Sequence, residues 1–380
     1  MTVTEQIRNW FDHFHANPEV SWEEQKTTQE IARILTEMEV PYKTFEDVTG
    51  AVAEIGEGDS VIAVRADIDA LWQEVDDVYQ ANHSCGHDGH MAMVLGALTY
   101  LKEENLGCRI RFIFQPAEEK GNGSNAMIDR GAVDDVSYMF GIHLRPQEEL
   151  PLGKASAAIR HGAAYFVEGT IRGVDAHGAR PHQGVNAIDP LLAIGQFLKT
   201  VQFSPYEAYS VKLTHVQAGG ESLNIIPGSA KFGLDIRAQS NDVLQQLQKR
   251  VDKGVQQIAE LYTTKIDLEW ADYTPAAEVS DEAVAIAREG ILAVLGEKGL
   301  AADVVTSGSD DFHFYTIRNP ELKATMIGLG ADLRPGLHHP EMTFNRDALI
   351  TGAKILAETL KIASFKAWDV VGKPWFFKGK

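Results

Sequence analysis

Short apolar segments alternate with amphipathic ones along most of the chain, and this alternation most limits how the chain can fold. Residues 51–55, 61–64 and 109–115 are short and apolar, as buried strands are. Residues 21–39 instead carry apolar side chains at the spacing of an amphipathic helix. The alternation predicts an α/β layer with a mostly parallel sheet covered on both faces by helices.

The pattern changes near Gly162 and returns after Pro275. Between them, four strand-like segments and two long helical segments predict two helices on one antiparallel sheet. A chain of 380 residues is long enough for two domains. We therefore expect one α/β domain formed by residues 1–162 and 275–380, interrupted by an inserted α+β domain at residues 163–274.

Composition excludes several classes of protein. The formal net charge of −19 would repel a phosphate backbone or an anionic membrane, so we expect neither nucleic acid nor a membrane as a partner. The first residues lack the basic start and apolar core of a signal peptide. Only two cysteines, Cys85 and Cys108, are present, which is too few for a disulfide framework. These features predict a soluble cytoplasmic protein.

The segment from His83 to His90 is the densest group of metal-binding side chains in the sequence. It combines the thiol of Cys85 with several imidazoles, among them that of His87, and with the carboxylate of Asp88. A mixed set of this kind suits zinc or a neighbouring divalent transition metal. By itself, however, it could also be a polar loop with incidental histidines.

Further ligand-type side chains follow predicted strands. Glu118 and Glu119 come soon after the apolar segment 111–114, His143 ends the segment 138–143, and His338 lies in a turn near the other end of the chain. Strand ends at one edge of an α/β sheet are where sites form. Five or more protein ligands exceed the needs of one tetrahedral ion, which favours two ions that share a bridging group.

Several motifs, in order along nearly the whole chain, resemble the dinuclear metal amidohydrolases, the family that includes aminoacylases, hippurate hydrolases and auxin-conjugate (IAA-amino acid) hydrolases. The matching residues are Arg65-Ala66-Asp67-Ile68-Asp69-Ala70-Leu71, Cys85-Gly86-His87-Asp88-Gly89-His90, Phe114-Gln115-Pro116-Ala117-Glu118-Glu119, Gly141-Ile142-His143, Asn224-Ile225-Ile226-Pro227, Ser309-Asp310-Asp311-Phe312 and Leu337-His338-His339-Pro340. The resemblance implies a catalytic domain like that of zinc peptidases and an inserted lid and dimerisation domain.

The resemblance also implies roles for individual residues. Two divalent ions per subunit would be held by Cys85, His87, Glu119, His143 and His338. Glu118 would be the general base that takes a proton from the attacking water and returns it to the leaving amine. Asp67 would orient the site from behind the ligands. The expected reaction is hydrolysis of the amide bond of an N-acyl amino acid.

In the inserted domain, the resemblance assigns His177 to stabilisation of the tetrahedral oxyanion, in its own site or in that of a partner subunit. Asn224 and Arg237 are candidates for binding the substrate carboxylate, which the planar guanidinium of an arginine can bind through two hydrogen bonds. For Arg237, an ordinary surface role on a strand fits the sequence equally well. The inserted domain would also form the contact of a homodimer.

Three other interpretations are consistent with the residues. A metal-dependent dipeptidase or carboxypeptidase could share this fold. A thiol-nucleophile amidase could use Cys85 with Glu119 and Lys120, and would not need the histidines. The fold could also bind a ligand without turnover. Manganese and zinc are the metals we expect first, while cobalt and nickel also suit the mixed nitrogen, oxygen and sulfur ligands. The acyl group and the amino acid are left open.

Overall fold

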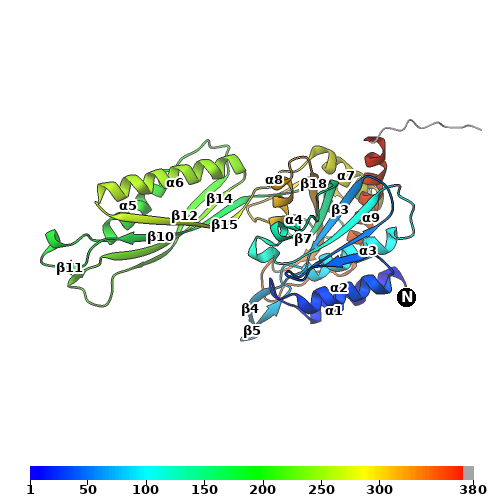
Figure 1. Cartoon of the computed structure of the whole chain (residues 1–380), viewed down its shortest axis with the longest axis horizontal. Helices are drawn as coiled ribbons and strands as arrows, with labels where there is room; N and C mark the ends of the chain where they lie inside the picture. Colours follow the sequence, from blue (N-terminus) through cyan, green and yellow to red (C-terminus); the bar gives the residue numbers. More distant parts are fainter. Residues whose placement is uncertain (371–380) are drawn as a thin grey trace, which may run out of the picture. The chain divides into compact units, whose positions relative to one another are not determined.

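The computed structural model describes residues 1–370 and divides the chain into two compact units. The first unit contains Met1–Arg160, Glu278–Val305 and the residues from Asp311 onward, and the second contains His161–Ala277 with Thr306–Asp310. Figure 1 labels the helices and strands of both units. Each unit has its own cluster of buried apolar side chains.

An eight-stranded sheet forms the centre of the first unit, in the order β1-β2-β6-β3-β7-β18-β8-β16. Strand β3 runs parallel to both β6 and β7, and β7 runs parallel to β18. The strands are apolar and almost fully buried at the middle of the sheet, as the sequence predicts for a parallel sheet with covered faces. The strands of this sheet are β1 (Tyr42–Thr44), β2 (Ala51–Ile55), β3 (Val61–Asp67), β6 (Arg109–Gln115), β7 (Val136–Pro146), β8 (Ala155–Ser156), β16 (Leu300–Ala301) and β18 (Lys323–Leu333).

Helices cover this sheet and complete the core. Helices α3 and α9 contact each other and strand β3, while α4 contacts β6 and lies beside α8. Helix α3 is buried on nearly all sides, so its sequence from Met91 to Leu98 is apolar on every face instead of amphipathic. The helices of this unit are α1 (Val3–Ala16), α2 (Gln25–Glu37), α3 (His87–Leu101), α4 (Gly123–Asp129), α7 (Asp281–Leu295), α8 (Phe314–Arg318) and α9 (Asp347–Val370).

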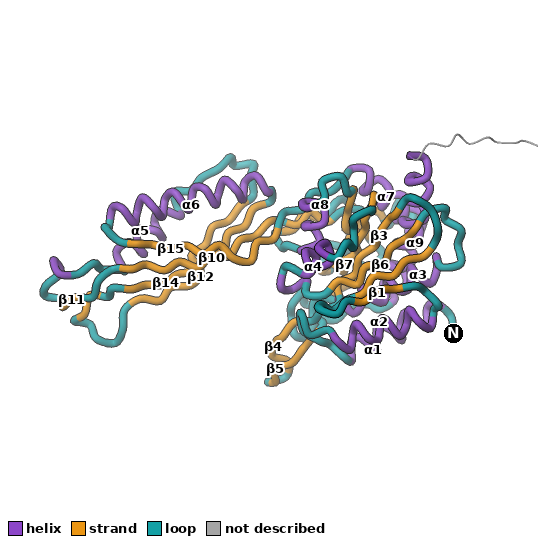
Figure 2. The backbone as a smooth tube through the Cα atoms, in the orientation of Figure 1, coloured by secondary structure: helices purple, strands orange, loops and turns teal. Residues whose placement is uncertain are grey.

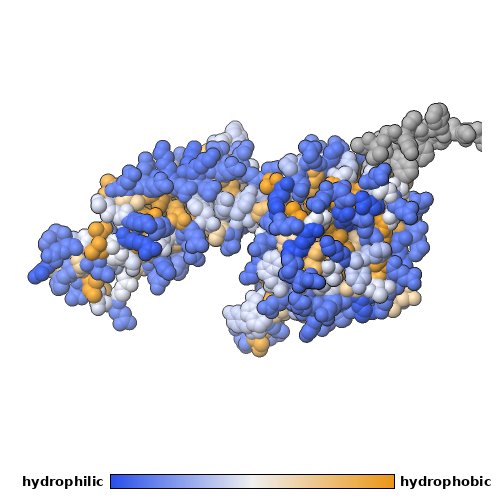
Figure 3. Space-filling model, in the orientation of Figure 1, coloured by the Kyte–Doolittle hydropathy of each residue, from blue (hydrophilic) through white to orange (hydrophobic). Residues whose placement is uncertain are grey.

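The second unit is a four-stranded antiparallel sheet in the order β12-β14-β10-β15, with helices α5 and α6 packed against it (Figure 2). Helix α6 buries one apolar face and presents a hydrophilic surface on the side seen in Figure 3. The predicted arrangement of two helices on an antiparallel sheet is therefore confirmed. The elements are β10 (Ala163–Arg172), β11 (Ala176–His177), α5 (Ile188–Leu198), β12 (Tyr209–Ala218), β13 (Ile225–Ile226), β14 (Ser229–Ala238), α6 (Asn241–Leu261) and β15 (Lys265–Thr274). The short strands β9 (Ile159–His161) and β17 (Val304–Thr306) lie where the chain passes between the units.

Two features were not expected from the sequence. Helix α1 precedes the first predicted helix and begins with a capping box between Thr2 and Glu5. A hairpin of β4 (Leu71–Val75) and β5 (Val78–Asn82) also joins the end of β3 to the Cys85 segment. No helix in the described part of the chain is long and apolar enough to cross a membrane.

Candidate metal centre

The predicted site forms at the carboxyl ends of the parallel strands. Asp67 is the last residue of β3, and Glu118 and Glu119 form a short 3-10 helix three residues after β6. His143 lies inside β7 and not at its end, because β7 continues to Pro146 beside β18. Parallel strands align their carboxyl ends at one edge of a sheet, which explains why residues far apart in sequence meet here.

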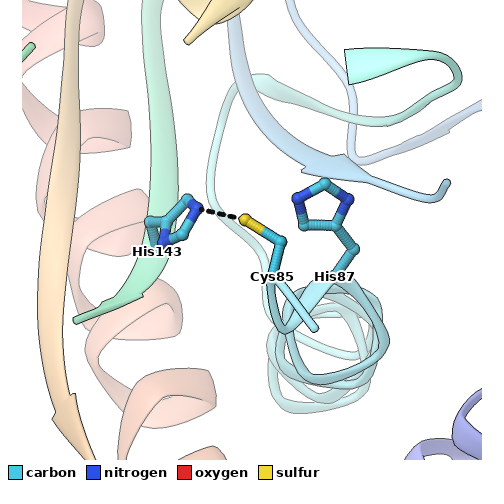
Figure 4. Close-up of side chains that lie close together, drawn as sticks. All are labelled: Cys85, His87 and His143. Atoms are coloured by element: carbon cyan, nitrogen blue, oxygen red, sulfur yellow. Dashed lines mark hydrogen bonds between the residues drawn. The ribbon is translucent and has the colours of Figure 1, made fainter. Parts of the chain in front are cut away.

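Cys85 and His87 reach the site from the start of helix α3 (Figure 4). The helix begins at His87, and its N-cap Gly86 has a φ of +88°. This left-handed conformation suits glycine because it has no Cβ. The turn directs the buried thiol of Cys85 toward strand β7, where its Sγ lies 3.6 Å from Nε2 of His143.

Backbone carbonyls orient the imidazoles of two predicted ligands. Nδ1 of His87 lies 2.9 Å from the carbonyl oxygen of Asp69, and Nδ1 of His143 lies 2.7 Å from that of Leu144. A carbonyl can only accept, so each Nδ1 carries a proton, and Nε2 is the nitrogen left to bind a metal. Nε2 of His87 is buried and has no hydrogen-bond partner. This is the arrangement expected of an imidazole that binds a metal.

The carboxylates of Glu118 and Glu119 face the same nitrogen. Oε2 of Glu118 lies 3.8 Å, and Oε1 of Glu119 lies 4.0 Å, from Nε2 of His87. Oε1 of Glu119 is also 3.3 Å from Nε2 of His338, whose turn is held by a hydrogen bond from its backbone N–H to the carbonyl of Ser84. The neighbouring His339 accepts the backbone N–H of Glu341 at its Nδ1.

The five predicted ligands form two sets of three that share one residue. The ligand atoms of Cys85, His87 and His143 all lie within 4.8 Å of one another, and so do those of Cys85, Glu119 and His338. A thiolate common to both sets could bridge two ions. Protein thiolates, imidazoles and carboxylates are the ligands that divalent transition metals accept.

The electrostatics of the site also fit a cation. Burial, together with the negative charge of Glu119, raises the pKa of the Cys85 thiol to about 12. Burial and neighbouring charged groups hold the pKa of His143 well below its ordinary value, so that imidazole is neutral. Burial alone would lower the pKa of His87, but the carboxylate of Asp67 raises it well above the ordinary value. A bound cation would stabilise the thiolate and the neutral His87 that ligation requires.

A layer of buried polar residues lies behind the ligands. Asp67 accepts a hydrogen bond from Nδ1 of His90 at 2.7 Å and forms an ion pair with Arg65 at 2.5 Å. Nε2 of His90 accepts the backbone N–H of Leu144, so both ring nitrogens of His90 are occupied. Arg65 also pairs with Asp311 at 2.9 Å. His90 is therefore unsuited to bind a metal, although it lies in the same motif as His87.

Asp69 is a residue that our sequence reasoning did not single out. Its carbonyl accepts Nδ1–H of His87, while its Oδ2 accepts the hydroxyl of Ser21 at 2.7 Å and the backbone N–H of Glu119 at 3.0 Å. Asp69 thus hydrogen-bonds two of the predicted ligand residues, whereas Asp67 lies 3.8 Å from Nε2 of His87. Asp69 lies two residues after Asp67 in the motif Arg65–Leu71, and this position was the feature of the sequence that could have indicated its role.

The three remaining predicted residues lie in the second unit. His177 pairs with Ile225 between β11 and β13, and the backbone N–H of Gly178 donates to the carbonyl of Asn224 at 2.7 Å. The structure therefore brings His177 and Asn224 close together on an exposed part of that unit. Arg237 lies elsewhere, on β14, where its guanidinium pairs with Asp235 at 2.8 Å and stacks over Phe166.

Comparison with known proteins identifies the class. Residues 63–362 match the model of peptidase family M20/M25/M40, and the chain belongs to this family. It is 31% identical to an N-acetylcysteine deacetylase of Bacillus subtilis over 366 residues, which cover 90% of this chain and 93% of that protein. It is 30% identical to IAA-amino acid hydrolase ILR1-like 4 of Arabidopsis thaliana over 370 residues, or 90% of this chain and 82% of that protein.

A solved structure agrees with these relatives. A Bacillus subtilis protein described as a dinuclear metal binding peptidase of the M20 family superposes with a TM-score of 0.83 and 28% identity. The alignment covers 96% of this chain and 98% of that one. The predicted family, the α/β fold with an added antiparallel unit, and the class of metal-dependent amidohydrolase are confirmed.

Proposed function

We propose that this chain hydrolyses the amide bond of N-acyl amino acids by means of two divalent ions held by Cys85, His87, Glu119, His143 and His338. The observation that carries the proposal is the pair of three-residue ligand sets that share Cys85. The similarity to a deacetylase of N-acetylcysteine and to a hydrolase of IAA-amino acids supports an acyl amino acid as the substrate.

The residues around the centre have separate tasks in this proposal. Divalent ions bound there supply Lewis acidity, which polarises the amide carbonyl and makes water acidic enough to attack near neutral pH. Glu118 takes the proton from the attacking water and delivers it to the nitrogen of the leaving amine. Its side chain is only 11% exposed and its Oε2 lies 3.8 Å from Nε2 of His87, which supports this role. The products are a carboxylic acid and a free amino acid.

Asp67 and the inserted unit have supporting roles in the proposal. Asp67, which pairs with Arg65 and His90, orients the site from behind the proposed ligands. His177 stabilises the tetrahedral oxyanion, and Asn224 binds the substrate carboxylate next to it. Arg237, whose guanidinium pairs with Asp235, is a second candidate for binding that carboxylate. We propose that the inserted unit is also the contact of a homodimer, supported by the edge strand β12 and the exposed side chains of Leu192 and Val216.

The metals that fit this ligand set first are manganese and zinc, followed by cobalt and nickel. Both cysteines are buried and free, and a thiolate ligand at Cys85 requires a reduced thiol. This supports a cytoplasmic location, where thiols remain reduced. The burial that raises the pKa of Cys85 argues against that thiol as the attacking nucleophile, since nucleophilic cysteines have a lowered pKa.

The proposal is tested by release of amino acids from a panel of N-acetyl and N-benzoyl amino acids and of matched dipeptides. We expect hydrolysis of the acyl amino acids that disappears after chelation and returns with Mn²⁺ or Zn²⁺. Glu118→Ala should lower kcat at least about a hundredfold, because it removes general base catalysis, while metal binding persists. Glu46→Ala, at an exposed carboxylate elsewhere on the first unit, is the matched control and should behave like the wild type.

Other results would change the assignment. Faster turnover of dipeptides than of acyl amino acids would indicate a metallopeptidase. Activity that survives chelation but is lost in Cys85→Ser would indicate a thiol nucleophile. Binding of two ions per chain without turnover of any compound would contradict the proposed substrate class and favour a binding protein.

A further inference from the structure

A buried carboxylate outside the ligand set contacts the loop that carries Glu118 and Glu119. Glu24, at the N-cap position of α2, has no exposed surface. Its Oε1 accepts the backbone N–H of Ala117 at 2.8 Å, and its Oε2 accepts the hydroxyl of Thr49 at 2.6 Å. Burying a carboxyl group is unfavourable unless hydrogen bonds satisfy it, so these two bonds explain how Glu24 is accommodated.

The residue that Glu24 holds has an unusual backbone conformation. Ala117 has φ and ψ of +49° and +44°, in the left-handed region that side chains with a Cβ rarely adopt. It is also the N-cap of the 3-10 helix Glu118–Lys120, so its conformation sets the direction in which that helix starts. Such a conformation persists only where surrounding contacts impose it. The hydrogen bond from Ala117 to Glu24 is such a contact.

Two buried carboxylates hold alternate peptides of the same turn. Glu24 accepts the N–H of Ala117, and Asp69 accepts the N–H of Glu119 at 3.0 Å. The residue between them, Glu118, has its Oε2 3.8 Å from Nε2 of His87. The two backbone bonds thus fix the turn on either side of the proposed general base. Asp69 belongs to the metal centre itself, whereas Glu24 contacts none of the five proposed ligands.

We propose that Glu24 is a positioning residue, whose hydrogen bond to the N–H of Ala117 holds the turn so that Glu118 and Glu119 face the metal centre. Its effect on turnover rests on the proposed function, but its effect on metal binding through Glu119 does not. Residues that hold metal ligands in place typically contribute about tenfold to a hundredfold in metal affinity or activity.

The test compares Glu24→Ala, Glu24→Gln and Glu19→Ala. Glu19 is a matched control, because its carboxylate lies in the same segment and accepts hydrogen bonds from Thr27 at 2.8 and 2.9 Å, but none from the turn that carries Glu118 and Glu119. Affinity for Zn²⁺ alone is measured by competition with a chromophoric chelator. For each variant kcat and KM are measured with N-acetyl amino acids, and thermal unfolding is followed in parallel.

We expect Glu24→Ala to lose about tenfold to a hundredfold in Zn²⁺ affinity and in kcat at saturating metal, with KM within about threefold of the wild type. Glu24→Gln should recover most of both, because its amide oxygen can accept the same N–H. Glu19→Ala should lower thermal stability without changing either quantity.

Equal Zn²⁺ affinity and kcat in Glu24→Ala and Glu19→Ala would overturn the proposal, as would a Glu24→Gln variant impaired as much as Glu24→Ala. If Glu24→Ala does not fold, Glu24→Asp replaces it, since the shorter side chain withdraws the carboxylate from the N–H of Ala117. Unchanged Zn²⁺ affinity and kcat in that variant would also overturn the proposal. A wild-type protein that binds Zn²⁺ but has no turnover would refute the proposed function only, and the Zn²⁺ affinities would still decide the role of Glu24.

Discussion

Single hydrogen bonds decide which atoms of the histidines are available at the centre. His87 and His90 lie one helical turn apart in the same motif, and both are buried. His87 donates Nδ1–H to a backbone carbonyl and keeps Nε2 free, whereas His90 uses both nitrogens, with Asp67 and with the N–H of Leu144. The same side chain is therefore available to a metal at one position and acts as a structural support at the other.

His15 allows a prediction of pH dependence at this scale. Its Nδ1 lies 2.7 Å from the buried carboxylate of Asp88, and this hydrogen bond raises the pKa of His15 above the ordinary 6.5. The protonated imidazole is thus favoured by folding. Its stabilisation should be complete below the ordinary pKa and should be lost as the pH rises through the higher pKa of the folded state.

The measurement is urea unfolding of chelator-treated wild type and His15→Gln at about pH 5.5 and about pH 9. The wild type should be more stable than the variant by less than about 1 kcal/mol at the lower pH, because the His15 side chain is 48% exposed and solvent screens the pair. The advantage should shrink at the higher pH. An advantage that grows with pH would contradict this assignment.

The loop between β6 and α4 carries two of the residues proposed for the site, Glu118 and Glu119. Glycine is required at its end, because a Cβ at Gly123 would lie 1.6 Å from the carbonyl oxygen of Pro116. The N–H of Gly123 also donates to the carbonyl of Ala117 at 3.2 Å, which closes the loop on itself. Helix α4 can therefore begin directly beneath the turn that carries Glu118 and Glu119.

Gly123→Ala should displace this turn, since neither the carbonyl nor the start of the helix can move alone. We expect the free energy of unfolding to fall by about 1–3 kcal/mol, as for overpacked sites, and kcat to fall at least about tenfold. Gly220→Ala is the control, because a Cβ there meets no atom within 4 Å. Chemical denaturation and steady-state kinetics measure both effects, and an active, stable Gly123→Ala would show that the loop tolerates this shift.

At the scale of the molecule, each of the two units contains a separate hydrophobic core. Phe112, Phe140 and Leu356 belong to the core of the first unit, while Phe232 and Leu247 belong to that of the second. The ligand set lies wholly in the first unit, whereas His177 and Asn224 lie in the second. The proposed metal ligands and the proposed substrate contacts thus lie in units with separate hydrophobic cores. We expect a mutation in one core to change the stability of that unit without changing that of the other.

Leu247→Ala tests this separation. Leu247 is fully buried in the second core, so its truncation should lower the stability of that unit by about 2–5 kcal/mol. Calorimetry should show an earlier unfolding transition for the second unit, while Zn²⁺ affinity, measured below that transition, stays at the wild-type value. A single transition that moves as a whole together with a loss of Zn²⁺ affinity would show instead that the two cores unfold as one.

The sequence by itself determined the alternation of strands and helices, the interruption that forms the second unit, and the types of side chain at the site. These properties are local, because periodicity reflects which face of each element is buried. It also indicated Cys85, His87 and Glu119 as candidate ligands, through their residue types and the resemblance of the motifs that contain them. It did not predict helix α1 or the β4–β5 hairpin, whose apolar patterns are short or mixed with charged residues.

Only the tertiary structure decided how these side chains are held. The bond from Ala117 to Glu24 joins residues 93 positions apart, and the pair of Arg65 with Asp311 joins residues 246 apart. No local pattern encodes such partners, because they depend on how the strands and helices pack around the carboxyl edge of the sheet. The same packing leaves Nε2 of His87 without a hydrogen-bond partner, and that nitrogen makes a polar motif a candidate metal centre.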